Sequence, residues 1–166
     1  MKSTEINEFV KALLALRHSN DNGVRAAMMR GLSTTTESYA YPYVLPLLPP
    51  TASVHDQNVA LIVAALIARY DTIPAYSEEI PNGVRFGKWV AQTGRDIGSA
   101  ETRIRFLHTQ DLSEAGHSIN RLLTMCPHTL PLDWKALART LFFWGTGADE
   151  RSQYTRLSIA RDYYTN

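Results

Sequence analysis

The chain has 166 residues, of which 45% are apolar and 20% are charged, and its formal net charge at pH 7 is +1. This composition is too apolar for a disordered protein and fits one globular domain or two small subdomains. The single cysteine, Cys126, excludes an intrachain disulfide and agrees with a reducing compartment. The longest apolar run, residues 59–68, is too short to span a bilayer, so we expect a cytoplasmic protein with no membrane partner.

The first part of the chain shows a helical period. Near the N-terminus, apolar residues recur at the spacing of an amphipathic helix: Ile6, Phe9, Val10, Leu13 and Leu14. Asn22 and Gly23 are expected to break the chain before a second helix, in which Arg25 is free to face outward.

A buried helix and a linker follow. Pro42 fits the first turn of a short helix. Residues 59–68 are almost wholly apolar, which predicts a helix buried on most sides, with Asp56 as its N-cap. Residues 71–83 contain two prolines, a glycine and three acids, the composition of a linker. We therefore predict a lobe boundary after residue 80.

The second half consists of further predicted helices. Ser99 and Ser113 are candidate N-caps for two of them. Asp133 is the predicted N-cap of the next helix and Gly145 its stop. That helix has an apolar stripe typical of a core-facing helix: Trp134, Leu137, Ala138, Leu141 and Phe142. A last helix is expected over residues 149–164.

Taken together, these elements predict an all-α fold. Eight or nine helices with short connections and no alternating strand pattern indicate a two-lobed helical bundle, with lobes over residues 1–80 and 81–166. No phosphate loop, dinucleotide fingerprint, nucleophile elbow or paired-cysteine metal site is present. We therefore predict no catalytic residue, no metal site and no cofactor, and we interpret Cys126 as a buried, inert thiol.

One dipeptide suggests an alternative function. His55-Asp56 matches the dipeptide of helical metal-dependent phosphohydrolases, in which a further histidine and a distant aspartate complete the metal shell. His18 could serve as that histidine, and Asp133 or Asp111 as that aspartate. The competing interpretation of Asp56 is a helix cap, which we favour.

The near-neutral net charge conceals an uneven distribution of charged residues. Residues 10–35 hold four basic residues against one acid, residues 37–80 hold five acids against one arginine, and residues 81–145 hold eight basic residues against five acids. Most of the 17 cations are arginine, whose planar guanidinium binds two phosphate oxygens at once. The pattern suggests phosphate-contacting surfaces, with solvated polar faces as the alternative.

Two helix faces carry cations at one-turn spacing. Lys135 and Arg139 lie off the apolar stripe of their helix. His117 and Arg121 lie opposite the apolar positions of theirs, and both side chains can donate to a phosphate oxygen.

Several segments, in order and at similar spacing, match one known family. They are residues 24–32 (VRAAMMRGL), 41–48 (YPYVLPLL), 93–111 (TGRDIGSAETRIRFLHTQD), 119–145 (INRLLTMCPHTLPLDWKALARTLFFWG) and 160–164 (ARDYY). In this ordered set the chain resembles the CasB family, the small subunit of the type I-E CRISPR surveillance complex Cascade. Some members carry consecutive arginines where this chain has Thr102-Arg103 and Asn120-Arg121.

The resemblance implies a fold, partners and a function. It implies an all-α, non-catalytic protein with two helical lobes, used as a pair of copies within a crRNA-guided complex. Its partners would be the Cascade backbone and large subunits, crRNA and target DNA. A basic surface would help to hold the opened target, especially the displaced non-target strand, and so stabilise the R-loop.

The predicted nucleic-acid-binding residues are seven cations: Arg25, Arg30, Arg95, Arg103, Arg121, Lys135 and Arg139. Arg105 ranks lower, because two residues from Arg103 on a helix is nearly the opposite face. The aromatic residues Trp134, Phe142 and Trp144 are predicted to be core. Two alternatives remain, a helical adaptor that binds only protein, with its arginines in salt bridges, and the metal-dependent phosphohydrolase.

Overall fold

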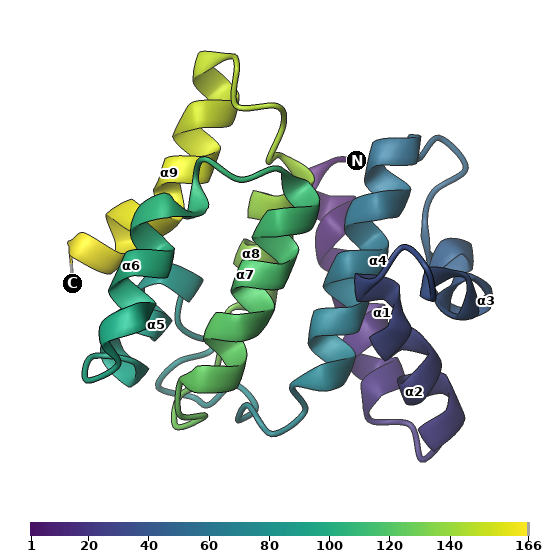
Figure 1. The fold of residues 1–166 in the computed structure, drawn as a ribbon. Coiled ribbons are helices and arrows are strands. Elements are labelled where there is room, and N and C mark those ends of the chain that lie inside the picture. Colours follow the sequence, from purple (N-terminus) through teal and green to yellow (C-terminus); the bar gives the residue numbers. More distant parts are fainter. Residues whose placement is uncertain (166) are drawn as a thin grey trace. The chain divides into compact units, whose positions relative to one another are not determined.

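The computed structural model describes residues 1–165, which form nine α-helices and three short 3-10 helices (Figure 1). Within that range the β-type pairing is limited to one isolated parallel bridge between Val84 and Leu132. The prediction of an all-α fold with eight or nine helices is confirmed. None of the helices in the described range combines the length and the apolar character needed to cross a membrane.

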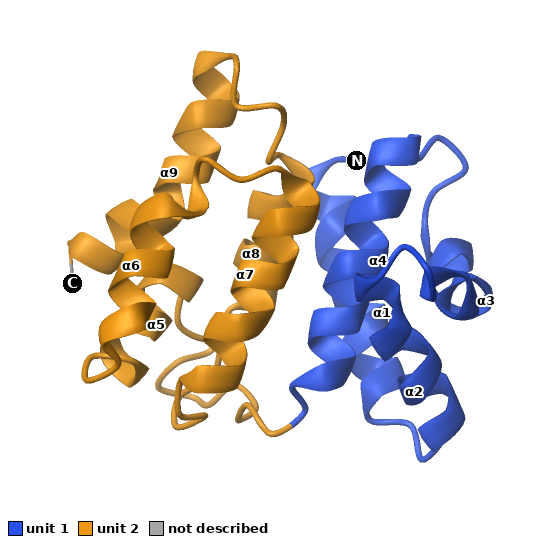
Figure 2. Ribbon diagram, in the orientation of Figure 1, with its two compact units in different colours: residues 1–71 blue, residues 72–166 orange. Residues whose placement is uncertain are grey.

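The chain divides into two compact units, Met1–Asp71 and Thr72–Asn166 (Figure 2). This division comes before the boundary predicted after residue 80, because the segment following Asp71 belongs with unit 2. Thr72 Oγ1 lies 2.6 Å from Nδ1 of His128, and Ile73 is buried. Most of the predicted linker is therefore attached to one unit.

Unit 1 is organised around one buried helix. It contains α1 (Ser3–Arg17), α2 (Asn22–Met29), α3 (Tyr41–Val44) and α4 (Val54–Arg69), with the 3-10 helices η1 (Arg30–Leu32), η2 (Glu37–Ala40) and η3 (Leu45–Leu47). Helices α1, α2 and α3 and the 3-10 helix η1 all pack against α4. Every residue from 59 to 68 is buried, as the apolar run predicted. The core of unit 1 is thus α4 and the apolar faces turned towards it.

Unit 2 contains α5 (Phe86–Thr93), α6 (Gly98–Leu107), α7 (Leu112–Met125), α8 (Trp134–Phe142) and α9 (Glu150–Tyr164). Helices α5 and α9 make its most extensive packing. They approach so closely that the backbone carbonyl of Ile159 leaves no room for a Cβ at Gly87. Trp89, Trp134 and Trp144 are all buried, which confirms the two tryptophans predicted as core.

At two helix starts, the residue that caps the helix is not the one predicted from the sequence. The N-cap of α4 is Ser53, and Asp56 is the third residue of the helix. The Asp56 backbone N–H donates to Ser53 Oγ at 3.0 Å, while an Asp56 carboxylate oxygen accepts from the Ser53 backbone N–H at 3.0 Å. Helix α7 starts with the same reciprocal capping box, made by Asp111 and Glu114 instead of Ser113. In both boxes an acid lies in the first turn, where its charge complements the helix dipole.

Other boundaries differ because tertiary contacts compete with local signals. Asn22 and Gly23 form the first turn of α2, because the Asp21 carboxylate caps the helix by accepting from the Gly23 backbone N–H. Helix α6 begins at Gly98, and the hydroxyl of Ser99 donates to Met125 Sδ at 3.8 Å instead of capping. Asp133 caps α8 as predicted, by accepting from the Ala136 N–H at 2.9 Å.

Replacement of Asp56 by asparagine should destabilise unit 1 at neutral pH. Burial raises the pKa of this carboxyl group, but the hydrogen bonds from Ser53 and the charge of the Met1 amino group, 3.4 Å away, leave the pKa below its usual value. A lowered pKa in the folded state stabilises the protein above the unfolded pKa of about 4, and this stabilisation disappears as the pH falls. We expect Asp56→Asn to cost about 1 kcal/mol at pH 7, measured by urea unfolding.

The cost should shrink as the unfolding is repeated at pH 4 and below, where the wild-type carboxylate also becomes protonated. Asp96→Asn, at an exposed turn position, serves as the matched control and should behave as wild type. An equal cost at both pH values would contradict a role for the Asp56 charge.

Candidate nucleic-acid interface

Arg25 is engaged inside unit 1. Its Nε donates to the Ala68 carbonyl oxygen at 2.9 Å, and its Nη2 lies 3.0 Å from Asp71 Oδ1. The prediction that Arg25 faces freely outward is therefore wrong, because the C-terminal end of α4 supplies a carbonyl and a carboxylate that hold the side chain.

Arg105 is also paired. Its Nη2 donates to Glu101 Oε1 at 2.6 Å, one turn earlier on α6. Hydrogen bonds from the Tyr164 hydroxyl and from Arg105 hold the pKa of Glu101 below its usual value. The lower rank given to Arg105 thus agrees with its engagement in a surface ion pair.

The structure brings Arg103 and Arg121 to the same level of the α6–α7 hairpin. The register of this antiparallel pair follows from the contact between Ser99 Oγ and Met125 Sδ. Arg103 lies one turn after Ser99 and Arg121 one turn before Met125, so both arginines share the faces that make this contact. This register places Arg103 and Arg121 on neighbouring faces of the hairpin, although they lie 18 positions apart in the sequence.

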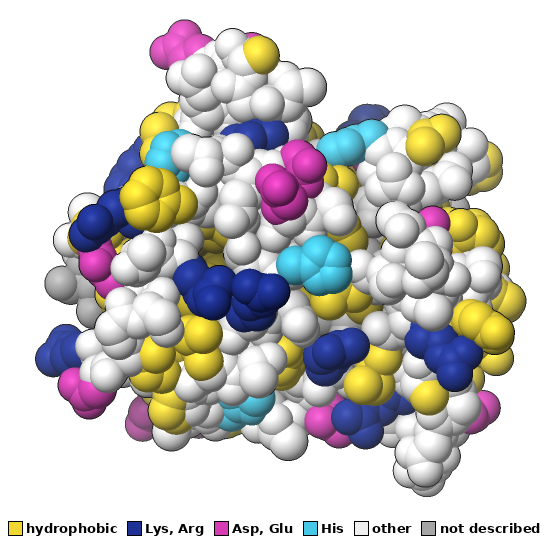
Figure 3. Space-filling model, viewed as in Figure 1, with side chains coloured by type: hydrophobic (Ala, Val, Ile, Leu, Met, Phe, Trp, Pro, Cys, Tyr) yellow, Lys and Arg dark blue, Asp and Glu magenta, His cyan; other side chains and the backbone are white. Residues whose placement is uncertain are grey.

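The Arg103–Arg121 pair has no acidic partner within residues 1–165. Neither guanidinium makes an ion pair or a hydrogen bond there, and Nε of Arg103 is buried without a partner. Figure 3 shows basic side chains gathered over α6 and α7. His117, one turn before Arg121 on α7, is exposed. Two like charges held together without a counter-ion form a site that favours an anion.

Lys135 and Arg139 lie one turn apart on α8, as predicted. Both are partly exposed, while the apolar stripe of the helix is buried. Lys135 makes no ion pair in the described part of the chain. Arg95 is exposed in the turn between α5 and α6.

Arg30 forms an aromatic contact that the sequence analysis missed. Its Cζ lies 4.3 Å from the centre of the Tyr39 ring, and both side chains are exposed. Tyr43, four residues further along the chain, is exposed as well. The sequence feature that could have indicated this aromatic surface is the segment YAYPYV, residues 39–44. Its tyrosines do not form a continuous apolar stripe, so they are not all expected to be core residues.

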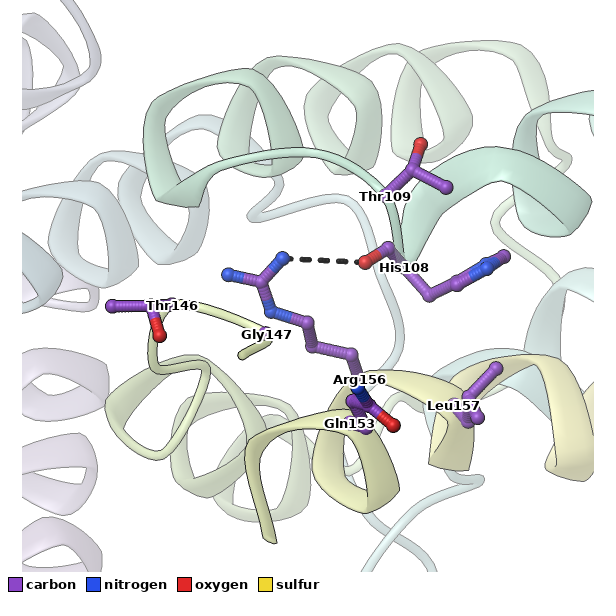
Figure 4. A pocket seen from close by; sticks show the side chains of 7 residues that line it. All are labelled: His108, Thr109, Thr146, Gly147, Gln153, Arg156 and Leu157. Atoms are coloured by element: carbon purple, nitrogen blue, oxygen red, sulfur yellow. Dashed lines mark hydrogen bonds between the residues drawn. The ribbon is translucent and has the colours of Figure 1, made fainter. Parts of the chain in front are cut away.

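Arg156 is a buried arginine with a structural task. Its guanidinium lies over the Trp144 ring and donates to the carbonyl oxygens of Trp144, Gly145, His108 and Gln110. Figure 4 shows the side chain beside a cavity of about 460 Å³. Burial lowers the pKa of Arg156, and the charges of Asp111 and Asp149 oppose part of this shift. The loop that surrounds the guanidinium needs Gly147, whose φ is +78°.

The carboxylates that could complete a metal shell lie at helix starts, where Asp111 and Asp133 are N-caps and Asp56 is the capping-box partner of Ser53. Asp56, Asp111 and Asp133 each accept a backbone N–H at a helix start. Among the residues that the structure describes, no group of three histidine, cysteine, aspartate or glutamate residues is placed to hold a metal ion. Cys126 is buried as predicted, and burial raises the pKa of its thiol. These positions give the phosphohydrolase alternative no specific support.

This helical arrangement is that of a class of CRISPR-associated proteins. A family model described as CRISPR-associated protein Cse2 matches residues 24–164. The chain therefore belongs to the Cse2 family, and the resemblance to CasB drawn from its sequence segments is confirmed. No match was found among curated proteins.

Solved structures share the fold at low sequence identity. A CRISPR-associated protein of the Cse2 family from Thermus thermophilus has a TM-score of 0.78 and 20% identity, and the match covers 97% of this chain and 98% of that one. A structure of CasB from Thermus thermophilus has a TM-score of 0.76 and 20% identity, with the same coverage. A chain of a CRISPR RNA-guided surveillance complex has a TM-score of 0.69 and 22% identity over 98% of this chain and 95% of that one.

Removal of the buried Arg156 guanidinium should destabilise the protein. Arg156→Met keeps much of the apolar stem but removes the donor to the carbonyl oxygens of His108 and Gly145. The carbonyl oxygens of Trp144 and Gln110 lose one donor and keep Ser152 Oγ and Trp144 Nε1 respectively. We expect a loss of about 3 kcal/mol, which corresponds to a fall in Tm of roughly 10 °C for a chain of this size, measured by circular dichroism. Arg151→Met removes an exposed arginine from the same helix and should leave Tm unchanged. Equal effects of the two substitutions would show that the carbonyl contacts contribute nothing.

Proposed function

We propose that this protein is a non-catalytic subunit of a CRISPR RNA-guided surveillance complex and binds nucleic acid through phosphate contacts. Membership of the Cse2 family supports the assignment to such a complex, and the likeness to a chain of a surveillance complex agrees with it. The observation that carries the nucleic-acid role is the Arg103–Arg121 pair, two arginines at one level of a helical hairpin with no acidic partner in the described chain.

The role of such a surface follows from the energetics of target opening. Formation of an R-loop exchanges one duplex for another of similar stability, so a few protein–backbone contacts can shift the balance. On unit 2 we propose five phosphate-contacting cations: Arg95, Arg103, Arg121, Lys135 and Arg139. On unit 1, Arg30 is proposed as a separate contact. These residues would contact the target and the displaced non-target strand. In the complex the protein would act as a pair of copies that contact crRNA and bridge the backbone and large subunits.

A second candidate is an adaptor that binds only protein. Two large apolar side chains on unit 2 favour it, because Phe106 is 53% exposed and Leu157 is 41% exposed. Such an adaptor would have no salt-dependent affinity for nucleic acid. The two functions therefore differ in a property of the purified chain.

Charge reversal at Arg103 and Arg121 should weaken nucleic-acid binding through the salt-dependent term. Each phosphate contact on a single strand adds about 0.7 to the slope of log affinity against log salt concentration. We expect the double variant Arg103→Glu/Arg121→Glu to bind all sequences more weakly. The slope should become less steep by the contribution of one to two phosphate contacts, about 0.7 to 1.4. Fluorescence anisotropy with a labelled single strand over a salt series measures both quantities.

The double variant Arg105→Glu/Arg151→Glu is the matched control, because it changes the net charge equally at an ion-paired and a distant position. It should retain most of the affinity and the slope. In the assembled complex, the Arg103/Arg121 variant should reduce stable R-loops more than retention of guide RNA. A folded variant with unchanged affinity and slope would remove the nucleic-acid role and leave the protein-only adaptor.

A further inference from the structure

The Arg30–Tyr39 contact on unit 1 joins two 3-10 helices through a short turn. Arg30 begins η1 and Tyr39 lies in η2, and these two helices pack against each other. The Thr36 hydroxyl donates to the Arg30 carbonyl oxygen at 3.1 Å, and the Glu37 N–H donates to the Ser33 carbonyl oxygen at 2.8 Å. The turn between the two residues is therefore fixed by its own hydrogen bonds, and it holds the ring below the guanidinium.

Both members of this stack keep surfaces that no other group uses. The Arg30 guanidinium makes no hydrogen bond or ion pair in the described chain, so its in-plane N–H donors are unpaired. Tyr39 is 57% exposed although Arg30 lies over one face of its ring. The nearest acid along this segment, Glu37, accepts a hydrogen bond from the Tyr41 hydroxyl at 3.0 Å. A flat, cationic and aromatic surface is thus presented to solvent.

We propose that the Arg30–Tyr39 pair is a stacking site for a base of single-stranded nucleic acid. This inference rests on the nucleic-acid role proposed above and specifies its ligand as an unpaired strand. Guanidinium planes and aromatic rings both stack on bases, and the unpaired N–H donors of Arg30 would reach a neighbouring phosphate. A duplex keeps the faces of its bases inside its own stack and cannot use such a site.

A second arginine–tyrosine contact in the protein provides the comparison. On α9, Cζ of Arg161 lies 4.4 Å from the centre of the Tyr154 ring, and Tyr154 is 62% exposed. Here Glu150 lies one turn before Tyr154 on the same helix, and Asp162, which follows Arg161, is ion-paired with Arg85 at 2.7 Å. The two contacts therefore resemble each other in geometry, and Tyr154 is an exposed tyrosine matched to Tyr39.

The test compares strands that carry the same phosphates with and without bases. Labelled oligothymidylate and an abasic strand of equal length are titrated with the full-length protein at several salt concentrations. Stacking of one base contributes about 1–3 kcal/mol, so the wild type should prefer the strand with bases by roughly 5- to 150-fold. Tyr39→Ala should reduce this preference to near unity at an unchanged salt slope, whereas Tyr39→Phe should retain it. Arg30→Lys should keep the slope and lose part of the preference.

Tyr154→Ala is the matched control and should keep the preference of the wild type. Circular dichroism checks that each variant is folded, which the exposure of Tyr39 leads us to expect. Salt-dependent binding with no preference for bases would overturn the stacking site and leave the phosphate contacts intact. Equal loss on both strands after Tyr39→Ala, or loss of the preference after Tyr154→Ala, would also overturn it. Absence of salt-dependent binding by the wild type would instead remove the proposed function itself. A Tyr39→Ala defect confined to protein assembly would assign the surface to a protein partner.

Discussion

Buried backbone carbonyl groups must find donors, and arginine side chains supply many of them in this protein. The last carbonyls of a helix have no partner within that helix. At the C-terminal end of α4, Arg17 donates to the carbonyls of Ile67 and Tyr70, and Arg25 donates to that of Ala68. In unit 2, Arg156 likewise donates to backbone carbonyls, those of Trp144 and Gln110. Each unit therefore depends on at least one arginine that is unavailable to a ligand.

This constraint divides the arginines into two populations with different consequences. An arginine held by carbonyls or by a carboxylate is fixed in position, and its N–H donors are already used within the protein. Arg30, Arg103 and Arg121 have no such partner within residues 1–165. An unpaired guanidinium loses little on binding a phosphate, because it has no internal contact to break. The proposed interface is for this reason smaller than the number of arginines in the sequence suggests.

Three of the acids also have a structural role. Asp56, Asp111 and Asp133 each accept backbone N–H groups at the start of a helix, where a carboxylate complements the helix dipole. An acid used in this way sets where a helix begins and is directed towards the backbone of its own element. The capping acids therefore help to fix the position of the helices that present the free cations, Arg121 on α7 and Lys135 on α8.

The sequence by itself determined the all-α fold, the buried helix over residues 59–68, the cap at Asp133 and the aromatic core, because helical period and capping act over a few neighbouring residues. Tertiary structure alone decided which cations are free. Arg25 meets a carboxylate 46 positions away and Arg156 a carbonyl at the same separation, so no local pattern separates these residues from Arg121. The level shared by Arg103 and Arg121 and the stacking of Arg30 on Tyr39 likewise depend on how helices pack and turns close, which the spacing of residues along one helix does not specify.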